Sequence, residues 1–294
     1  MKMLLTGVQG QVGSALLPLL PVLGTVVGLD RTHLDLADPD AVRAAVLAHR
    51  PQVILNAAAY TAVDRAETEP GLAHAVNAVA PGILAETARH IGAALIHYST
   101  DYVFDGSASR PYTETDTPHP LGVYGQSKWQ GEQAVLASGA PALVLRTSWV
   151  YSLQGHNFLR TMLRLGKERD SLQVVDDQWG APTWAGSLAR ATTHILHQAL
   201  EAGGPHAFLE QHNGIYHMTN GGATTWFDFA RAIFALRPEC TARVTPIPAS
   251  AWPSPARRPA NSRLDNRKLL EHFHCRLPDW EDALQHCLEE GTLP

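Results

Sequence analysis

The chain has 294 residues, 45% of them hydrophobic and 17% charged, which is the composition of a globular protein with a substantial core. Its net charge of −5 contains no basic block, which argues against nucleic acid as a partner. Three late cysteines (Cys240, Cys275 and Cys287) and dispersed histidines match no metal or disulfide pattern. We expect no metal site.

The first residues, "MKMLLTG", have too short an apolar run for a signal peptide, and no later stretch is long enough to span a bilayer. The expected location is therefore the cytoplasm, with no membrane partner.

Apolar and β-branched runs alternate with helical patterns along the first half of the chain. Strands are expected at 1–7, 25–30, 51–59, 93–100 and 141–151. Helices are expected between them, at 13–23, bent or shortened at Pro18, at 38–50, at 70–92 as one or two helices broken near Pro81, and at 124–138. Repeated strand–helix–strand units predict an α/β fold of Rossmann type, with a doubly wound parallel sheet.

After Val150 the alternation loosens, although 183–200 reads as a helix and 214–220 as a strand that could return to the sheet. We therefore expect a main domain of residues 1–150 plus 184–220. A smaller, discontinuous C-terminal region of residues 151–183 plus 221–294 is expected to cover one end of the sheet.

The first predicted strand ends in "TGVQGQVG", which places Gly7, Gly10 and Gly13 directly before a helix. Residues without a Cβ permit a tight turn and a close approach of the backbone to a pyrophosphate. The free N–H groups of the helix start suit the same phosphates. Glycine spacing alone is a weak signal, but its place in a strand–turn–helix unit predicts a dinucleotide site.

The second strand ends at Asp30, whose carboxylate is placed to accept both hydroxyl hydrogens of an adenosine ribose. Arg31 beside it could meet a 2′-phosphate, so NADH is the first choice and NADPH is tolerated. Asp35 and Leu36 are expected near the adenine, although Asp35 could equally be a helix N-cap. Small residues, including Ala57, end the third strand, where bulk would block a cofactor.

The fourth strand ends in "STD", and Tyr124 and Lys128 follow at the start of the next helix. Residues four apart share a helix face, so both could point into the same cleft as Thr100. A carbonyl that accepts hydride needs a proton donor, and we expect Lys128 to lower the pKa of Tyr124 and to bind the nicotinamide ribose. Thr100 would orient the substrate oxygen. Gly125, Gln126 and Ser127 are interpreted as helical spacing only.

These motifs resemble the extended short-chain dehydrogenase/reductase superfamily. Further segments resemble the dTDP-4-dehydrorhamnose reductase family within it, and the match extends to about Leu270. The most specific are "VVDDQWGAPT" and "ARRPANSRLD"; the others are "NAAAYTAVDRAETEP", "VNAVAP", "PLGVYGQSKWQGE", "RTSWVY" and "HNFLRTML".

The resemblance implies reduction of the C4 ketone of dTDP-4-dehydro-β-L-rhamnose by NADH or NADPH. Tyr124 matches the proton donor of the family, Lys128 its ribose-binding lysine and Thr100 its hydroxyl near the ketone. The substrate positions that it implies are Asp101, Trp149, Asn157 and Arg258, whereas Arg257 is interpreted as a surface charge. The cofactor positions that it implies are Gly10, Gln11, Val12, Asp30, Asp35, Leu36, Ala59, Tyr60 and Thr61.

One departure concerns assembly. Some members of the family are dimers joined by magnesium bound to acidic side chains. The corresponding segments here read "GSALL" and "WAGSLAR", which carry no carboxylates, and Mg²⁺ needs oxygen ligands. We expect a monomer or a homodimer without a magnesium bridge.

Two other functions stay open. A nucleotide-sugar epimerase or dehydratase would use the same Tyr–Lys pair with tightly bound NAD. A non-catalytic regulatory subunit could keep the cofactor fold, although the intact Thr100, Tyr124 and Lys128 argue against it.

Overall fold

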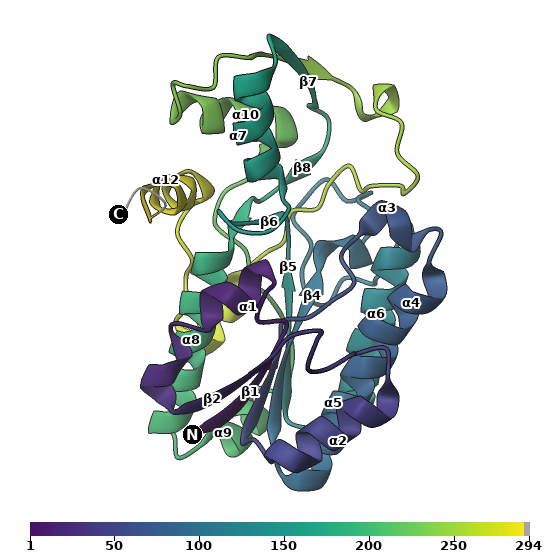
Figure 1. Ribbon diagram of the computed structural model, residues 1–294, viewed down its shortest axis with the longest axis vertical. Coiled ribbons are helices and arrows are strands. Elements are labelled where there is room, and N and C mark those ends of the chain that lie inside the picture. Colours follow the sequence, from purple (N-terminus) through teal and green to yellow (C-terminus); the bar gives the residue numbers. More distant parts are fainter. Residues whose placement is uncertain (291–294) are drawn as a thin grey trace.

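The structure, a computed structural model, describes residues 1–290 and is built around a six-stranded parallel sheet (Figure 1). The strand order is β10-β5-β4-β3-β1-β2, and every neighbouring pair is parallel. The strands are β1 (Lys2–Thr6), β2 (Thr25–Leu29), β3 (Val53–Asn56), β4 (Ala94–Thr100), β5 (Ala142–Thr147) and β10 (Gly214–His217). This arrangement confirms the predicted α/β fold of Rossmann type.

Helices cover both faces of the sheet (Figure 1). One face carries α1 (Gln11–Leu16), α8 (Ala185–Glu201), α9 (Pro205–Gln211) and α11 (Arg267–Phe273). The other carries α2 (Pro39–His49), α5 (Ala80–Ile91) and α6 (Val123–Ala137), with the short α3 (Val63–Ala66) and α4 (Pro70–His74) beside them.

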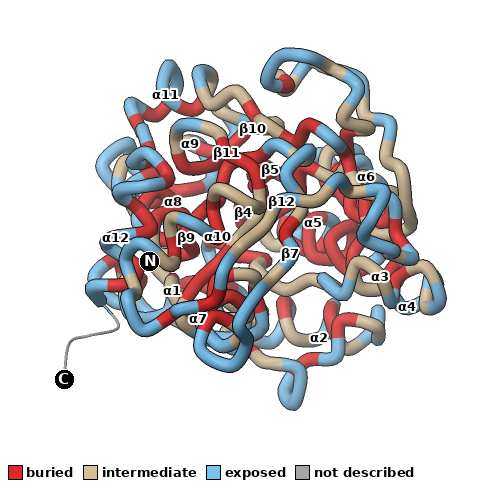
Figure 2. Tube along the Cα trace, turned by 90° about the horizontal axis from the view of Figure 1, so that it is seen from above, coloured by how far each residue is buried: buried red, intermediate tan, exposed pale blue. Residues whose placement is uncertain are grey.

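Alternate strand residues supply the two cores. Met3 and Leu5 of β1 lie in the cluster under α1 and α8, whereas Leu4 between them lies in the cluster under α2 and α5. Successive side chains of a strand point to opposite faces, so a sheet covered on both sides needs an unbroken apolar run. Figure 2 shows the buried residues gathered around the sheet and the exposed ones at the periphery.

Above the carboxyl ends of the strands, smaller elements have an apolar core of their own (Figure 1). They are β6 (Val150–Tyr151), α7 (Phe158–Glu168), β7 (Ser171–Val175), β8 (Trp179–Gly180), β9 (Thr183–Trp184), β11 (Thr224–Thr225), α10 (Trp226–Ala235), β12 (Arg243–Ile247) and α12 (Trp280–Glu290). The exact division into two regions stays a prediction, supported by this separate core and by the pairing of β10 with β5.

Several predicted elements have other bounds in the structure, and among them the third strand ends at Asn56 rather than at residue 59. Residues 70–92 do not break at Pro81, because a π-helical segment, Ala75–Val79, joins α4 to α5 and Pro81 lies in the first turn of α5. The first helix ends at Leu16, and a 3₁₀ helix, Leu20–Leu23, follows. The fifth strand ends at Thr147, earlier than expected.

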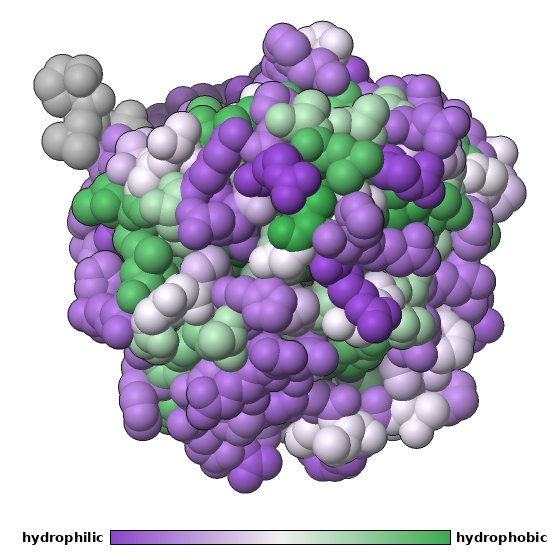
Figure 3. All heavy atoms as spheres, turned by 90° about the horizontal axis from the view of Figure 1, so that it is seen from below, coloured by the Kyte–Doolittle hydropathy of each residue, from purple (hydrophilic) through white to green (hydrophobic). Residues whose placement is uncertain are grey.

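The opposite end of the molecule, where the strands begin, is mainly hydrophilic, and its hydrophobic residues lie in separate groups (Figure 3). Within residues 1–290, no helix combines the length and apolar character needed to cross a bilayer.

Candidate active site

The glycine turn lies at the carboxyl end of β1, against the segment that follows β3. Gly7 has a φ of +72°, and a Cβ there would lie 2.8 Å from the backbone of Ala58. A Cβ on Gly13 would lie 2.1 Å from the carbonyl oxygen of Gly7. Gly10 is the N-cap of α1. The turn therefore admits no side chains at two of its glycines, and it packs closely on the backbone of Ala57 and Ala58.

Asp30, directly after β2, is fixed by its neighbours. Its carboxylate accepts hydrogen bonds from the backbone and hydroxyl of Thr32, at 2.9 and 2.6 Å, and contacts His33 Nδ1 at 2.8 Å. Thr32 first, and then His33, hold the pKa of Asp30 well below its ordinary value. Gln9 of the glycine turn donates to the same carboxylate at 2.6 Å, which links the two predicted cofactor segments. Arg31 is exposed.

The alternative role of Asp35 as a helix N-cap is wrong. Helix α2 begins at Pro39 and is capped by Asp38, whose carboxylate accepts from the N–H groups of Asp40 and Ala41. Asp35 instead accepts from the N–H of Ala37 at 2.9 Å, within the preceding turn. Leu36 is buried in the core beside α2.

The segment after β3, which contains Ala59, Tyr60 and Thr61, is held by a residue that the sequence analysis missed. The Asn77 side chain accepts from the N–H of Tyr60 at 2.8 Å and donates to its carbonyl at 3.0 Å. The same amide nitrogen donates to Ser127 of α6 at 3.0 Å. Asn77 belongs to the π-helical segment, a distortion that often marks functional sites.

Thr100 and Asp101 lie at the carboxyl end of β4, and both are buried. The hydroxyl of Thr100 donates to Asp101 Oδ1 at 3.0 Å and accepts from the N–H of Tyr102 at 3.2 Å. Burial raises the pKa of Asp101 to about 7. Its second oxygen, Oδ2, is buried and has no hydrogen-bond partner among residues 1–290. The hydroxyls of Ser262 and Thr100 oppose the shift in pKa, but burial outweighs them.

Tyr124 and Lys128 lie on the first turns of α6, as predicted, but one expectation about them is wrong. The Tyr124 ring is half-buried and meets the ring of Tyr102 edge-on, with 5.7 Å between centroids. Burial raises its pKa to about 12, although the Thr100 hydroxyl opposes the shift. Lys128 is not among the groups that shift this pKa; its Nζ donates to the carbonyl of Tyr98 at 2.6 Å and lies 3.4 Å from His97 Nε2.

The residues between Tyr124 and Lys128 do more than provide spacing. A Cβ at Gly125 would lie 2.1 Å from the carbonyl oxygen of Tyr102, so α6 packs directly on the segment after Thr100. Ser127 donates to the carbonyl of Tyr124 at 2.8 Å and accepts from Asn77. The helix start is therefore fixed against both neighbouring loops.

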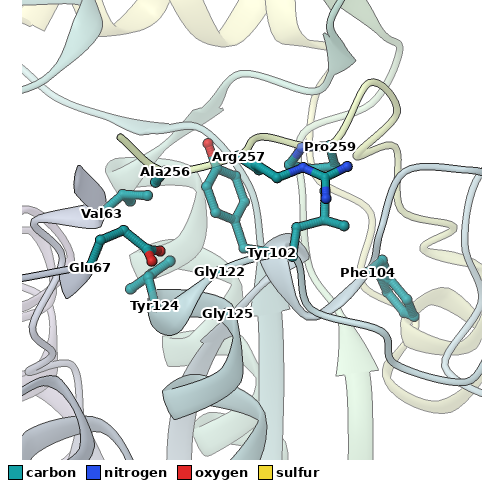
Figure 4. Close-up of a pocket in the computed structure, with 11 residues that line it drawn as sticks. Val63, Glu67, Tyr102, Phe104, Gly122, Tyr124, Gly125, Ala256, Arg257 and Pro259 are labelled. Atoms are coloured by element: carbon teal, nitrogen blue, oxygen red, sulfur yellow. The ribbon is translucent and has the colours of Figure 1, made fainter. Parts of the chain in front are cut away.

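A small pocket opens beside Tyr124, and Figure 4 shows its wall. Glu67, Tyr102 and Arg257 line it from three different segments, with the Tyr102 hydroxyl directed toward the loop at Ala256–Arg257. Arg257 is exposed, as a surface charge would be, yet it belongs to this wall. Arg258 instead contacts Ser254 and forms an ion pair with Asp64 of α3 at 2.9 Å. This pair ties the C-terminal loop to the main domain.

Trp149 is held in an unusual backbone conformation near the same end of the sheet. Its φ of 47° is rare for a bulky residue and marks local strain. The indole stacks on Trp226, with centroids 3.5 Å apart and planes 8° apart. The ring is half-buried and therefore differs from an ordinary core aromatic.

Asn157 serves as the N-cap of α7, where it accepts from the N–H of Arg160 at 3.1 Å. Its amide nitrogen donates to Gln11 Oε1 at 2.7 Å and to two backbone carbonyls. Gln11 also donates to the carbonyl of Val150 at 3.2 Å. The two amides thus join α1 to β6 and to the start of α7, and Val12 lies beside Gln11 on α1.

Within residues 1–290, no group of three or more His, Cys, Asp or Glu side chains could hold a metal ion.

A parallel sheet in this order, a glycine turn after β1 and a Thr–Tyr–Lys set around β4 and α6 define the extended short-chain dehydrogenase/reductase class. The family described as RmlD substrate binding domain matches residues 1–293. The dTDP-4-dehydrorhamnose reductase of Burkholderia thailandensis is 48% identical, with 99% of each chain covered, and that of Escherichia coli K12 is 43% identical over 99% of this chain and 98% of the relative. The chain belongs to the dTDP-4-dehydrorhamnose reductase family.

Solved structures agree. The dTDP-4-dehydrorhamnose reductase of Clostridium acetobutylicum superposes with a TM-score of 0.90 at 36% identity, and each chain is covered completely. That of Bacillus anthracis, in complex with NADP, gives 0.89 at 35% identity over 98% of this chain and 99% of the other. A UDP-glucose 4-epimerase of Thermus thermophilus gives 0.80 at 22% identity with full coverage of both chains, a likeness of fold alone.

Proposed function

We propose that this protein reduces the C4 ketone of dTDP-4-dehydro-β-L-rhamnose with NADH or NADPH and so forms dTDP-β-L-rhamnose. The observation that carries the proposal is the 48% identity, over 99% of both chains, to a curated reductase of that name. Thr100, Asp101 and Tyr124 come together at the carboxyl end of β4, and this supports the proposal. Ketone reduction needs a proton donor beside a group that orients the carbonyl oxygen.

The proposed cofactor site follows the glycine turn and the ends of β2 and β3. Its residues are Gly7, Gly10, Gln11, Val12, Asp30, Arg31, Asp35, Leu36, Ala57, Ala59, Tyr60, Thr61, Tyr124 and Lys128. The close backbone packing at Gly7 and Gly13, which leaves the turn bare of side chains, and the anchored Asp30 carboxylate fit a dinucleotide with a ribose diol. When bound, the reduced nicotinamide supplies the hydride. Lys128 would bind its ribose.

In the reaction, Tyr124 would deliver a proton from its hydroxyl to the C4 oxygen, and Thr100 would orient that oxygen. Burial favours the protonated phenol, which is the form that an acid needs before transfer. Asp101, at the same end of β4 as Thr100, would contact the sugar, and Trp149 would pack on the sugar ring. Arg258, whose guanidinium forms an ion pair with Asp64, would contact the diphosphate, and Asn157 would act through Gln11 rather than by a free amide.

The deciding experiment measures NADH and NADPH oxidation with dTDP-4-dehydrorhamnose that is generated in situ. A reductase oxidises one equivalent of cofactor for each product formed. An epimerase would recycle its cofactor and a dehydratase would show no net oxidation, so the absence of stoichiometric oxidation would overturn the proposal. A regulatory subunit would bind the cofactor and a large partner without turnover.

The proposal includes a cytoplasmic enzyme that is a monomer or a homodimer without a magnesium bridge. The lack of carboxylates in "GSALL" and "WAGSLAR" supports the last point. The net charge of −5 supports the absence of a nucleic-acid partner. Light scattering with Mg²⁺ and with EDTA tests the assembly, since a magnesium bridge would make the mass depend on the chelator.

A further inference from the structure

Four buried polar side chains form a continuous line under the catalytic helix, across β4, β3 and β1. Lys128 Nζ lies 3.4 Å from His97 Nε2, and His97 Nδ1 lies 3.0 Å from the Asn56 amide nitrogen. The Asn56 amide oxygen lies 2.7 Å from Thr6 Oγ1. None of the four is more than 2% exposed. Buried polar groups are retained where hydrogen bonds satisfy them, so each contact of the line constrains the next.

The ionisation of His97 follows from its surroundings. Burial first, and then the charge of Lys128, hold the pKa of His97 well below its ordinary value, so the imidazole is neutral and carries one N–H. An ammonium can only donate hydrogen bonds. Lys128 therefore has a partner in His97 only when Nε2 is the unprotonated nitrogen and the hydrogen is on Nδ1.

That tautomer determines the orientation of Asn56. The structure has the amide nitrogen of Asn56 toward His97; in that orientation Nδ1 must accept, Nε2 carries the hydrogen, and two donors meet, the ammonium and Nε2–H. With the amide turned over, its oxygen accepts from Nδ1–H and its nitrogen donates to Thr6. Only the second orientation gives an unbroken donor-to-acceptor sequence from the ammonium to Thr6.

The other groups that face Lys128 do not replace His97. The Tyr98 carbonyl accepts one of its three hydrogens. Glu132 raises the pKa of Lys128 by its charge, but burial outweighs it and lowers that pKa to about 8. Both Glu132 oxygens are engaged by Arg146 of β5, at 2.9 and 2.6 Å. The remaining hydrogen of the ammonium is left for a ligand.

We infer that His97 is a positioning residue for Lys128: as the Nδ1–H tautomer, held by Asn56 and Thr6, it accepts one ammonium hydrogen and so keeps Lys128 charged and in place. The kinetic consequences rest on the proposed function, but the tautomer does not. Without Lys128, no ammonium donates to Nε2, and the imidazole no longer favours the tautomer with its hydrogen on Nδ1.

Two substitutions separate the two ring nitrogens. The terminal amide of His97→Gln reaches the position of Nε2 and keeps a partner for Lys128, whereas that of His97→Asn reaches only the position of Nδ1 and keeps the contact with Asn56. We expect His97→Gln to retain kcat within about threefold. We expect His97→Asn to lose about tenfold or more at pH 8.5, with the basic limb of the pH–rate profile moved to lower pH and a smaller loss at pH 6.5. Equal effects of the two variants would overturn the inference.

Nitrogen NMR of the unliganded wild type tests the tautomer without any assay. We expect the hydrogen on Nδ1 at pH 7, and loss of that preference in Lys128→Met. A hydrogen on Nε2 at pH 7 would overturn the inference even if His97→Asn failed to fold. A wild type without reductase activity but with the Nδ1–H tautomer would overturn the proposed function and leave the arrangement of Lys128 standing.

Discussion

Glu67 Oε1 accepts the backbone N–H of Val123 at 2.9 Å, one residue before Tyr124. The N-cap residue of α6, Gly122, has no side chain to perform this task. A carboxylate at a helix start satisfies a free N–H group and also interacts favourably with the helix dipole. Glu67, directly after α3 and beside Tyr124 in the pocket wall, therefore fixes the first turn of the helix that carries the proposed proton donor (Figure 4).

Glu67→Ala is expected to lower kcat about tenfold, because a small displacement of Tyr124 relative to the ketone is costly. The loss of a helix cap should destabilise the protein by about 1 kcal/mol. Glu67→Gln keeps an accepting oxygen and is the matched control. Steady-state kinetics and thermal unfolding of both variants test this, and a Gln variant as impaired as the Ala variant would point to a role for the charge.

Tyr124→Phe is expected to retain cofactor affinity and to lose kcat by about 10²- to 10⁴-fold, because only the proton donor is removed. Cofactor fluorescence titration and turnover measure the two effects separately. Tyr102→Phe, which removes a neighbouring hydroxyl but keeps the ring packed against Tyr124, is the control and should keep most of the activity. Unchanged turnover in Tyr124→Phe would exclude the assigned role.

Asp101→Asn is expected to change how stability depends on pH. Burial raises the pKa of Asp101 to about 7, above the value of an unfolded chain, so the folded state holds the proton more tightly. The wild type therefore loses stability as pH rises from about 4 to 7, by about 4 kcal/mol in total. The Asn variant lacks this dependence. Urea unfolding at pH 4 and pH 8 compares the two, and parallel curves would contradict the buried, protonated state.

Trp226→Ala removes the ring on which Trp149 stacks. An aromatic pair contributes about 1 kcal/mol, so we expect the KM for the sugar nucleotide to rise about fivefold to tenfold. The KM for the cofactor should stay within about twofold, which serves as the internal control. Equal changes in both constants would mean that the stack supports the fold rather than the proposed sugar site.

Arg31→Ala tests the choice of cofactor. The exposed guanidinium beside Asp30 is placed to pair with the 2′-phosphate of NADPH, which NADH lacks. The variant should therefore raise the KM for NADPH about tenfold and leave that for NADH within about twofold. Lys2→Ala, which removes a distant positive charge, controls for the effect of the protein's overall charge on the binding of an anionic cofactor. An unaltered KM for NADPH would remove Arg31 from the site.

Local patterns were sufficient to predict the six strands of the main sheet, the glycine turn and the four-residue spacing of Tyr124 and Lys128, since each depends on neighbours in sequence, whereas the short strands β7 and β12 were missed. The contacts that depend on distant segments could not be predicted. Asn77 reaches Tyr60 only because residues 75–79 form a π-helix, and Lys128 turns to His97 because β4 lies beneath α6. The pKa of Tyr124 was predicted in the wrong direction, because burial is a property of the packed protein.

The π-helical segment Ala75–Val79 also limits how this chain can vary in length. A π-helix accommodates one residue more than the α-helical turn that it replaces, and each residue of an α-helix turns the chain by about 100°. Deleting a residue here would restore regular α-helix and rotate the Asn77 side chain away from Tyr60 and Ser127. Insertions and deletions are usually tolerated in surface loops, but here they would disturb the site from within a helical segment. The number of residues in 70–91 is therefore fixed by the site that this segment supports.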